Sequence, residues 1–115
     1  MTPPHLAPFT EACGLVFLSG QLAFDVEGKI SQATIAGQTK QVLANIGSVL
    51  NTAGLSLSDV VKTTVWLTQA TDFPAFNETY AAVFGESRPA RSTVISGLAH
   101  PLALVEIEIV ARRPV

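Results

Sequence analysis

Residues 33–53 show apolar and polar positions at the spacing of an amphipathic helix. Side chains suited to a buried face recur every three or four residues, at Ile35, Thr39, Val42, Leu43, Ile46, Val49, Leu50 and Ala53. The other face is expected to carry Gln38, Lys40, Gln41, Asn45 and Ser48. The pattern predicts a helix that begins after an N-cap at Ser31 and ends at Gly54, where a C-terminal glycine is favoured.

Apolar and polar positions alternate strictly in the segment after this helix. Over residues 60–68 the prediction places Val61, Val65 and Leu67 on one face and polar or amphipathic residues on the other, which is typical of a strand with one buried side. Shorter segments predict three further strands, at 15–19, 91–95 and 103–111.

Aromatic residues mark a second helix between a cap at Thr71 or Asp72 and a stop at Gly85. Its apolar stripe is Phe73, Phe76, Tyr80 and Phe84. The order of elements is satisfied by one mixed β-sheet with two helices packed on one face. We therefore predict an α+β fold and a single domain over residues 1–115.

Composition adds an expectation about assembly. Charged residues make up only 14% of the 115 residues and apolar residues 48%, whereas typical soluble domains carry roughly 25% charged residues. A monomer of this size cannot bury so much apolar surface, and large apolar patches usually form interfaces. The composition therefore favours an obligate oligomer.

Several classes of protein are disfavoured by the same chain. The longest uncharged run, 41–58, contains too many polar residues for a membrane span, and the apolar run near the N-terminus is too short for a signal peptide. A net charge of −2 gives no electrostatic reason to bind nucleic acid or anionic lipid. The single Cys13 excludes an internal disulfide and suits the cytoplasm; we expect it to be a small buried apolar residue.

Candidate chemistry is sparse. No Cys, His and carboxylate spacing is typical of a metal site, and we expect His5 to be solvated and His100 to lie in a loop. Arg91, which opens a predicted strand, offers a guanidinium suited to a carboxylate, although a surface ion pair is the simpler interpretation. Glu106 and Glu108 share one strand face, which is either solvated or the wall of a cleft between subunits. The residues permit a site for a small anion.

Six segments, in order from about residue 7 to the C-terminus, resemble the RidA (YjgF/YER057c/UK114) family. They are Ser19-Gly20-Gln21, Asn45, the DVVKTTV segment at 59–65, Asp72-Phe73 with Asn77 and Tyr80, Pro89-Ala90-Arg91-Ser92, and the LVEIE segment at 104–108. Together they are specific, and they cover nearly the whole chain.

The resemblance implies a chorismate-mutase-like fold and a homotrimer whose sheets form a central barrel, with sites in clefts between subunits. It implies hydrolytic deamination, without metal or cofactor, of 2-aminoacrylate, 2-iminopropanoate or 2-iminobutanoate to 2-oxo acids and ammonia. In this reading Arg91 binds the substrate carboxylate, Glu106 lies near the attacking water, and Ser19 and Gly20 line the cleft. An imine is already electrophilic, so positioning and one oriented water suffice.

Two positions depart from the family pattern. Phe9 stands where the family usually has tyrosine, which keeps an aromatic wall and removes a hydroxyl, and Thr93 replaces a frequent cysteine. The first departure leaves open an aminomuconate- or aminoacrylate-type imine of a catabolic pathway as substrate. A trimer that only binds small carboxylates, or acts as a holdase, is the alternative outside enzymes. The acidic chain, without a basic stripe, disfavours RNA cleavage.

Overall fold

Two eight-residue strands form the centre of the molecule, because their alternating side chains bury one face. In the computed structural model, which describes residues 2–115, β3 (Val60–Leu67) pairs antiparallel with β5 (Val105–Arg112). Every second side chain of β5, including Ile107 and Ile109, is almost completely buried. The intervening positions point to the other side of the sheet, as strand geometry requires.

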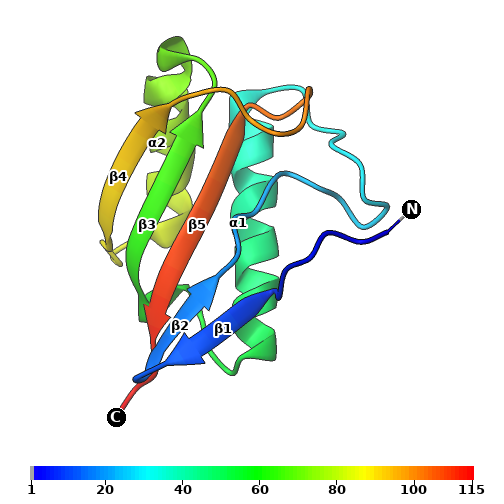
Figure 1. Ribbon diagram of the computed structural model, residues 1–115. Coiled ribbons are helices and arrows are strands. Elements are labelled where there is room, and N and C mark those ends of the chain that lie inside the picture. Colours follow the sequence, from blue (N-terminus) through cyan, green and yellow to red (C-terminus); the bar gives the residue numbers. More distant parts are fainter. Residues whose placement is uncertain (1) are drawn as a thin grey trace.

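Three shorter strands complete a mixed sheet in the order β1-β2-β5-β3-β4 (Figure 1). β4 (Ala90–Ile95) runs parallel to β3, whereas β2 (Leu15–Leu18) and β1 (Phe9–Ala12) add antiparallel neighbours on the β5 side. A parallel pair needs a crossover connection, and a helix supplies it between β3 and β4. The predicted single mixed sheet is confirmed.

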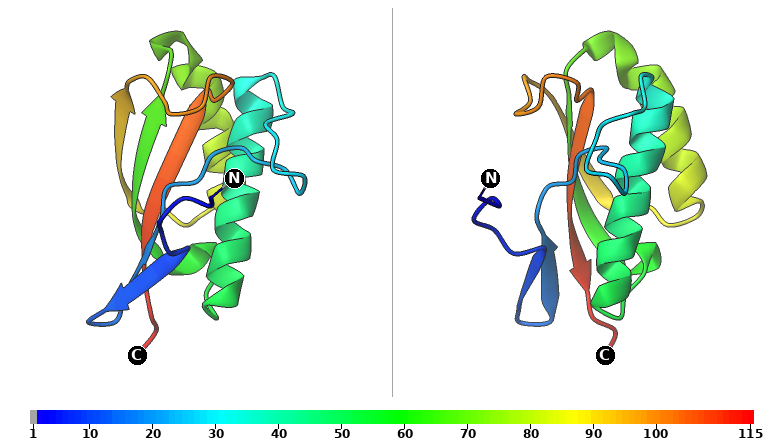
Figure 2. Two further views of the ribbon diagram at one scale, coloured as in Figure 1. Left: turned by 45° about the vertical axis from the view of Figure 1, so that its right-hand side comes forward. Right: turned by 90° about the vertical axis from the view of Figure 1, so that its right-hand side faces the viewer.

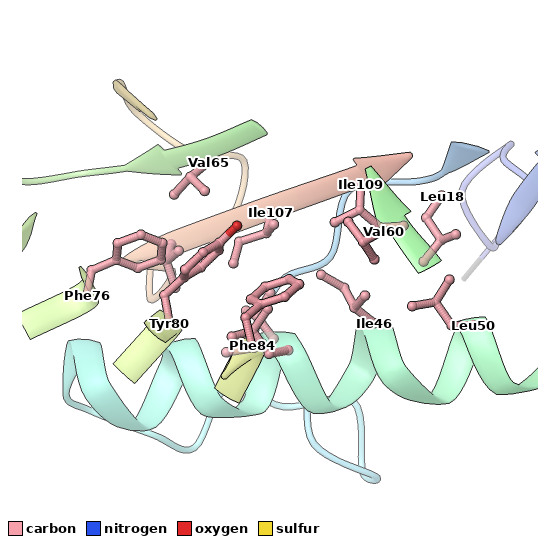
Figure 3. Packing of buried hydrophobic residues seen from close by; sticks show 14 of the residues in the cluster. Leu18, Ile46, Leu50, Val60, Val65, Phe76, Tyr80, Phe84, Ile107 and Ile109 are labelled. Atoms are coloured by element: carbon pink, nitrogen blue, oxygen red, sulfur yellow. The ribbon is translucent and has the colours of Figure 1, made fainter. Parts of the chain in front are cut away.

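Both helices lie on the same face of this sheet (Figure 2). α1 (Ile35–Thr52) and α2 (Phe73–Phe84) turn their apolar stripes toward the strands and contact each other. Figure 3 shows side chains of both helices, among them Ile46 and Phe76, pointing into the space beneath the sheet. The predicted α+β layer, with two helices on one face, is therefore confirmed.

The start of α1 differs from the prediction. Thr34, and not Ser31, is the N-cap, and its hydroxyl accepts a hydrogen bond of 3.0 Å from the backbone N–H of Gly37. Residues before Thr34 stay outside the helix partly because the Gln38 amide donates back to the carbonyl of Gln32 at 3.0 Å. Serine and threonine are comparable caps, so pattern alone does not choose between them.

A β-bulge in β3 removes Val61 from the buried face predicted for it. Val60 pairs with Ala111 and the next paired residue is Lys62, so that Val61 is the extra residue. Val61 is consequently 42% exposed instead of sharing the buried face with Val65. Strict alternation holds only beyond the bulge.

The N-terminal hairpin was not predicted, and it also corrects the expectation for Cys13. Cys13 and Gly14 join β1 to β2 with φ of 54° and 77°, the backbone of a tight type I′ turn. The Cys13 thiol is exposed rather than buried, because the tip of a hairpin has no core beside it. Polar and small residues in Phe9–Ala12 give this strand no apolar alternation.

The face of the sheet without helices, here the open face, keeps apolar side chains at the surface. Phe17 and Val94 are each 41% exposed on it, and Trp66 lies next to Val94 and Glu106 across the three strands that carry them. Within residues 2–115, no helix has the length and apolar character needed to cross a membrane. Apolar surface of this kind suits contact with another protein surface.

The strained turn predicts a stabilising substitution. Cys13→Asn creates the Asn-Gly pair that type I′ turns favour and should raise the free energy of unfolding by about 0.5–1 kcal/mol, since asparagine tolerates a positive φ. Cys13→Val should lower it by about 1 kcal/mol or more, because a β-branched side chain clashes in this conformation. Denaturant unfolding at one protein concentration measures both, and the opposite order of stabilities would contradict the turn assignment.

Candidate active site

Arg91 lies on the helix-covered side of the edge strand β4, against α2. The guanidinium carbon is 4.9 Å from the ring centroid of Tyr80, 5.4 Å from that of Phe76 and 5.7 Å from that of Phe73. Its Nη2 donates a hydrogen bond of 2.8 Å to Oδ1 of Asn77. Helical spacing explains the arrangement, because residues separated by three, four and seven positions share one side of a helix.

No carboxylate neutralises this guanidinium in the described part of the chain. The ion pair found there joins Arg113 to Glu11 at 2.6 Å, far along the sequence from Arg91. Aromatic faces and a neutral amide surround the Arg91 charge instead. The simpler interpretation from sequence, a surface ion pair, is therefore wrong for residues 2–115, and the charge remains able to bind an anion.

A cavity of about 290 Å³ opens beside Arg91. It lies between the C-terminal half of α2 and the start of β4, where Tyr80, Phe84 and Arg88 contribute to its wall. Tyr80 is fixed there by a buried hydrogen bond of 2.8 Å between its hydroxyl and that of Thr63, and burial raises the pKa of the Tyr80 phenol above its ordinary value. Apolar walls with two cationic groups suit a small organic anion.

Glu106 lies on the open face, with its carboxylate against the backbone of Gly20. A Cβ atom at position 20 would displace the Glu106 carboxylate, so glycine allows this carboxylate to lie directly against the backbone. The segment is held in place by the neighbouring Gln21, whose backbone N–H donates to the carbonyl of Ile107 at 2.8 Å and whose carbonyl accepts from Ile107 at 3.1 Å.

Electrostatics make Glu106 a better proton acceptor than an ordinary glutamate. Burial raises the pKa of the Glu106 carboxyl, and the charge of Glu108 on the same strand face raises it further. A carboxylate with a raised pKa binds protons more strongly near neutral pH, which suits a group that takes a proton from water.

Ser19 directly precedes Gly20, and Phe9 lies in the edge strand β1 opposite Leu18. The Ser19 hydroxyl donates a hydrogen bond of 2.6 Å to the carbonyl of Ala7, and its backbone N–H donates to that of Pro8 at 3.0 Å. Phe9 pairs with Leu18 and packs, half-buried, against the core. Because directly paired residues share one face, Phe9 faces the core together with the buried Leu18, and of the three predicted residues it is Gly20 that lies against the Glu106 carboxylate.

Within one chain the predicted residues form two separate groups. Arg91 and Thr93 are half-buried on the side of the sheet that faces the helices, opposite Thr63 and other residues of β3. Glu106 lies on the open face, across the intervening strand. We call these groups the arginine half-site and the carboxylate half-site. A single chain does not bring Arg91 and Glu106 together.

Sequence reasoning missed the immediate surroundings of Arg91. The sequence pattern assigns the aromatic stripe of α2 to the core alone, yet Phe73, Phe76 and Tyr80 also surround the guanidinium. Asn77 belongs to one of the family motifs, but no pattern in the sequence indicates that it contacts a residue fourteen positions later. No group of three or more metal-binding side chains occurs among residues 2–115.

Comparison with known proteins places the chain among characterised relatives. The family model for Endoribonuclease L-PSP matches residues 2–113. The 3-aminoacrylate deaminase RutC of Acinetobacter baylyi is 43% identical over 114 residues, which span 96% of this chain and 90% of that protein. Reactive Intermediate Deaminase A of Arabidopsis thaliana chloroplasts is 42% identical over 113 residues, covering 95% of this chain and 60% of its own length.

A solved structure extends the similarity to three dimensions. A Thermotoga maritima protein superposes with a TM-score of 0.91 at 35% identity, and the alignment covers 97% of this chain and 89% of that one. The resemblance drawn from the sequence is therefore confirmed. The chain belongs to the Endoribonuclease L-PSP family, which is the YjgF/RidA family.

Proposed function

We propose that this protein hydrolyses reactive 2-imino acids and their enamine tautomers, such as 2-iminopropanoate and 2-iminobutanoate, to 2-oxo acids and ammonia. The observation that carries the proposal is the half-buried Arg91 charge, which has no acidic partner in residues 2–115 and borders a cavity. Two relatives over 40% identical are named deaminases, which supports the same class of reaction.

The chemistry needs an anchor and one activated water. Arg91 binds the substrate carboxylate through paired N–H groups, which fixes the position of the neighbouring imine carbon. Glu106 accepts a proton from water as the oxygen attacks this carbon, giving a tetrahedral carbinolamine. This proton passes to the nitrogen, and the proton of the carbinolamine hydroxyl follows it through Glu106. The C–N bond then breaks, and ammonia leaves as the C=O bond of the 2-oxo acid forms.

The proposal requires a site shared between copies of the chain, because Arg91 and Glu106 lie on opposite sides of one sheet. We propose a homotrimer in which the arginine half-site of one subunit meets the carboxylate half-site of its neighbour. Exposed Phe17 and Val94 on the open face, and the low charge content, support such an assembly.

A second substrate class has a specific observation in its favour. The Acinetobacter relative is named for 3-aminoacrylate, whose nitrogen is one carbon further from the carboxylate than in a 2-imino acid. Phe9 offers an aromatic wall without a hydroxyl, so polar selection at this position is absent in either case. Comparing release of 2-oxo acid from 2-iminobutanoate with loss of 3-aminoacrylate on the same preparation decides between the two substrates.

Arg91 variants test the anchor. Arg91→Ala should reduce kcat/KM for 2-iminobutanoate by about a hundredfold or more, because a desolvated charge pair is typically worth about 2–5 kcal/mol. Arg91→Lys should lose most of the same activity, since a point charge cannot form two parallel hydrogen bonds. Release of 2-oxo acid, with semicarbazide as competing trap, measures both. Arg112→Ala is the control, and wild-type activity in a folded Arg91→Ala variant would contradict the proposal.

Mixing two inactive variants tests the shared site. Refolding equal amounts of Arg91→Ala and Glu106→Gln together should restore about a quarter of wild-type activity, because one in four random pairings in a cyclic oligomer joins an intact Arg91 to an intact Glu106. Light scattering should show trimers for both variants and for the mixture. Either a stable monomer or no recovery in a mixed trimer would refute a site formed between subunits.

The charge of Glu108 predicts a shift in pH dependence. Glu106 must be ionised to accept a proton, so activity is present above its pKa and is lost as pH falls through it. Glu108→Gln removes the like charge that raises this pKa, and the acidic limb of kcat/KM should therefore move to lower pH. The exposed Glu27→Gln should leave the profile in place. An acidic limb that stays fixed or moves upward in Glu108→Gln would contradict the role of Glu106.

A further inference from the structure

Asn77 makes the one side-chain hydrogen bond found for the Arg91 guanidinium among residues 2–115. Oδ1 of Asn77 accepts from Nη2 of Arg91 at 2.8 Å, and the amide is half-buried on the same side of α2 as the aromatic rings. A charge-assisted hydrogen bond of this length has a defined direction. Asn77 therefore constrains the orientation of Arg91 as well as its position.

The aromatic rings supply a different constraint. Phe73, Phe76 and Tyr80 place the guanidinium carbon within 5.7 Å of three ring centroids. Attraction to a ring face holds a cation near the ring but depends little on which N–H group points outward. The rings thus fix where the charge lies, and its rotation needs a directional partner.

The geometry of the guanidinium shows how Asn77 affects the N–H groups of Arg91 that remain free. Paired N–H groups occur along two edges of the fork, Nε with Nη2 and Nη1 with Nη2, and each edge uses a different hydrogen of Nη2. An acceptor on Nη2 occupies one edge and leaves the other complete. A carboxylate that binds bidentately then has a single edge of Arg91 available.

We infer that Asn77 is a positioning residue, which selects the edge of Arg91 that receives the substrate carboxylate. The inference rests on the proposed function, in which Arg91 anchors a carboxylate. A neutral amide is suited to this task because it orients the guanidinium without neutralising it, whereas an aspartate would form an ion pair and compete with the substrate. Tyr80, anchored to Thr63, keeps α2 in place beneath the pair.

Binding of 2-oxobutanoate, measured by titration calorimetry, tests the inference together with deamination of 2-iminobutanoate. Asn77→Ala should raise the Kd for 2-oxobutanoate and the KM for the imine about tenfold, since a hydrogen bond to a charged group is worth roughly 1.5–3 kcal/mol. The kcat should change much less, because Glu106 and its water are untouched. The exposed Glu78→Gln, one residue along α2, is the matched control and should bind as wild type does.

Asn77→Asp gives a readout that a purely structural role would not produce. It keeps the acceptor oxygen but adds a charge, so 2-oxobutanoate should bind at least tenfold more weakly near pH 7. Affinity should recover as pH falls through the pKa of the introduced carboxyl, whereas wild-type affinity stays level. This variant retains the hydrogen bond to Arg91, so it still tests the inference if Asn77→Ala unfolds.

The outcomes separate the two hypotheses. Wild-type affinity in folded Asn77→Ala, or a pH-independent affinity in Asn77→Asp, overturns the positioning role while leaving deamination intact. A wild-type protein that binds 2-oxobutanoate in an Asn77-dependent way but does not deaminate imines upholds the positioning role and overturns the proposed reaction. A wild-type protein that neither binds nor deaminates overturns both.

Discussion

The pairing of β3 with β5 is the constraint on which the rest of the structure depends. Their register decides which side chains face the helices and which face the open side, because successive residues of a strand alternate. Thr63 and Ile109 meet on the covered side, and the parallel strand β4 places Arg91 beside them. Glu106 falls on the opposite side for the same reason. A slip of one residue would exchange the two half-sites and expose the core.

This division supports the proposal that a small domain with so little charge works as part of an assembly. The arginine half-site has aromatic walls and a cation without a partner in the described residues. The carboxylate half-site has a close contact with Gly20 and lies next to exposed apolar residues. Each half holds one of the two groups that the proposed reaction uses, so the proposal requires two copies of the same chain.

Periodicity predicted the layers of the fold because long, strongly alternating segments bury one face whatever their neighbours are. It failed where a single residue breaks the period, as at the Val61 bulge, and where a strand lacks apolar alternation, as in Phe9–Ala12. Family motifs identified Arg91 and Glu106, which the structure places in separate groups. The contact between Asn77 and Arg91 could not be predicted from the sequence, because it depends on how closely α2 packs against the edge of the sheet.

The crossover between β3 and β4 has a consequence for the order of folding. The arginine half-site is built from one continuous stretch, from β3 through α2 to β4, so its contacts join nearer parts of the chain and need less loop closure. The carboxylate half-site joins Gly20 and Gln21 to the last strand, across most of the chain. Since long-range pairing is the slower event, we expect the arginine half-site to form early and the carboxylate half-site only when the two ends of the chain meet.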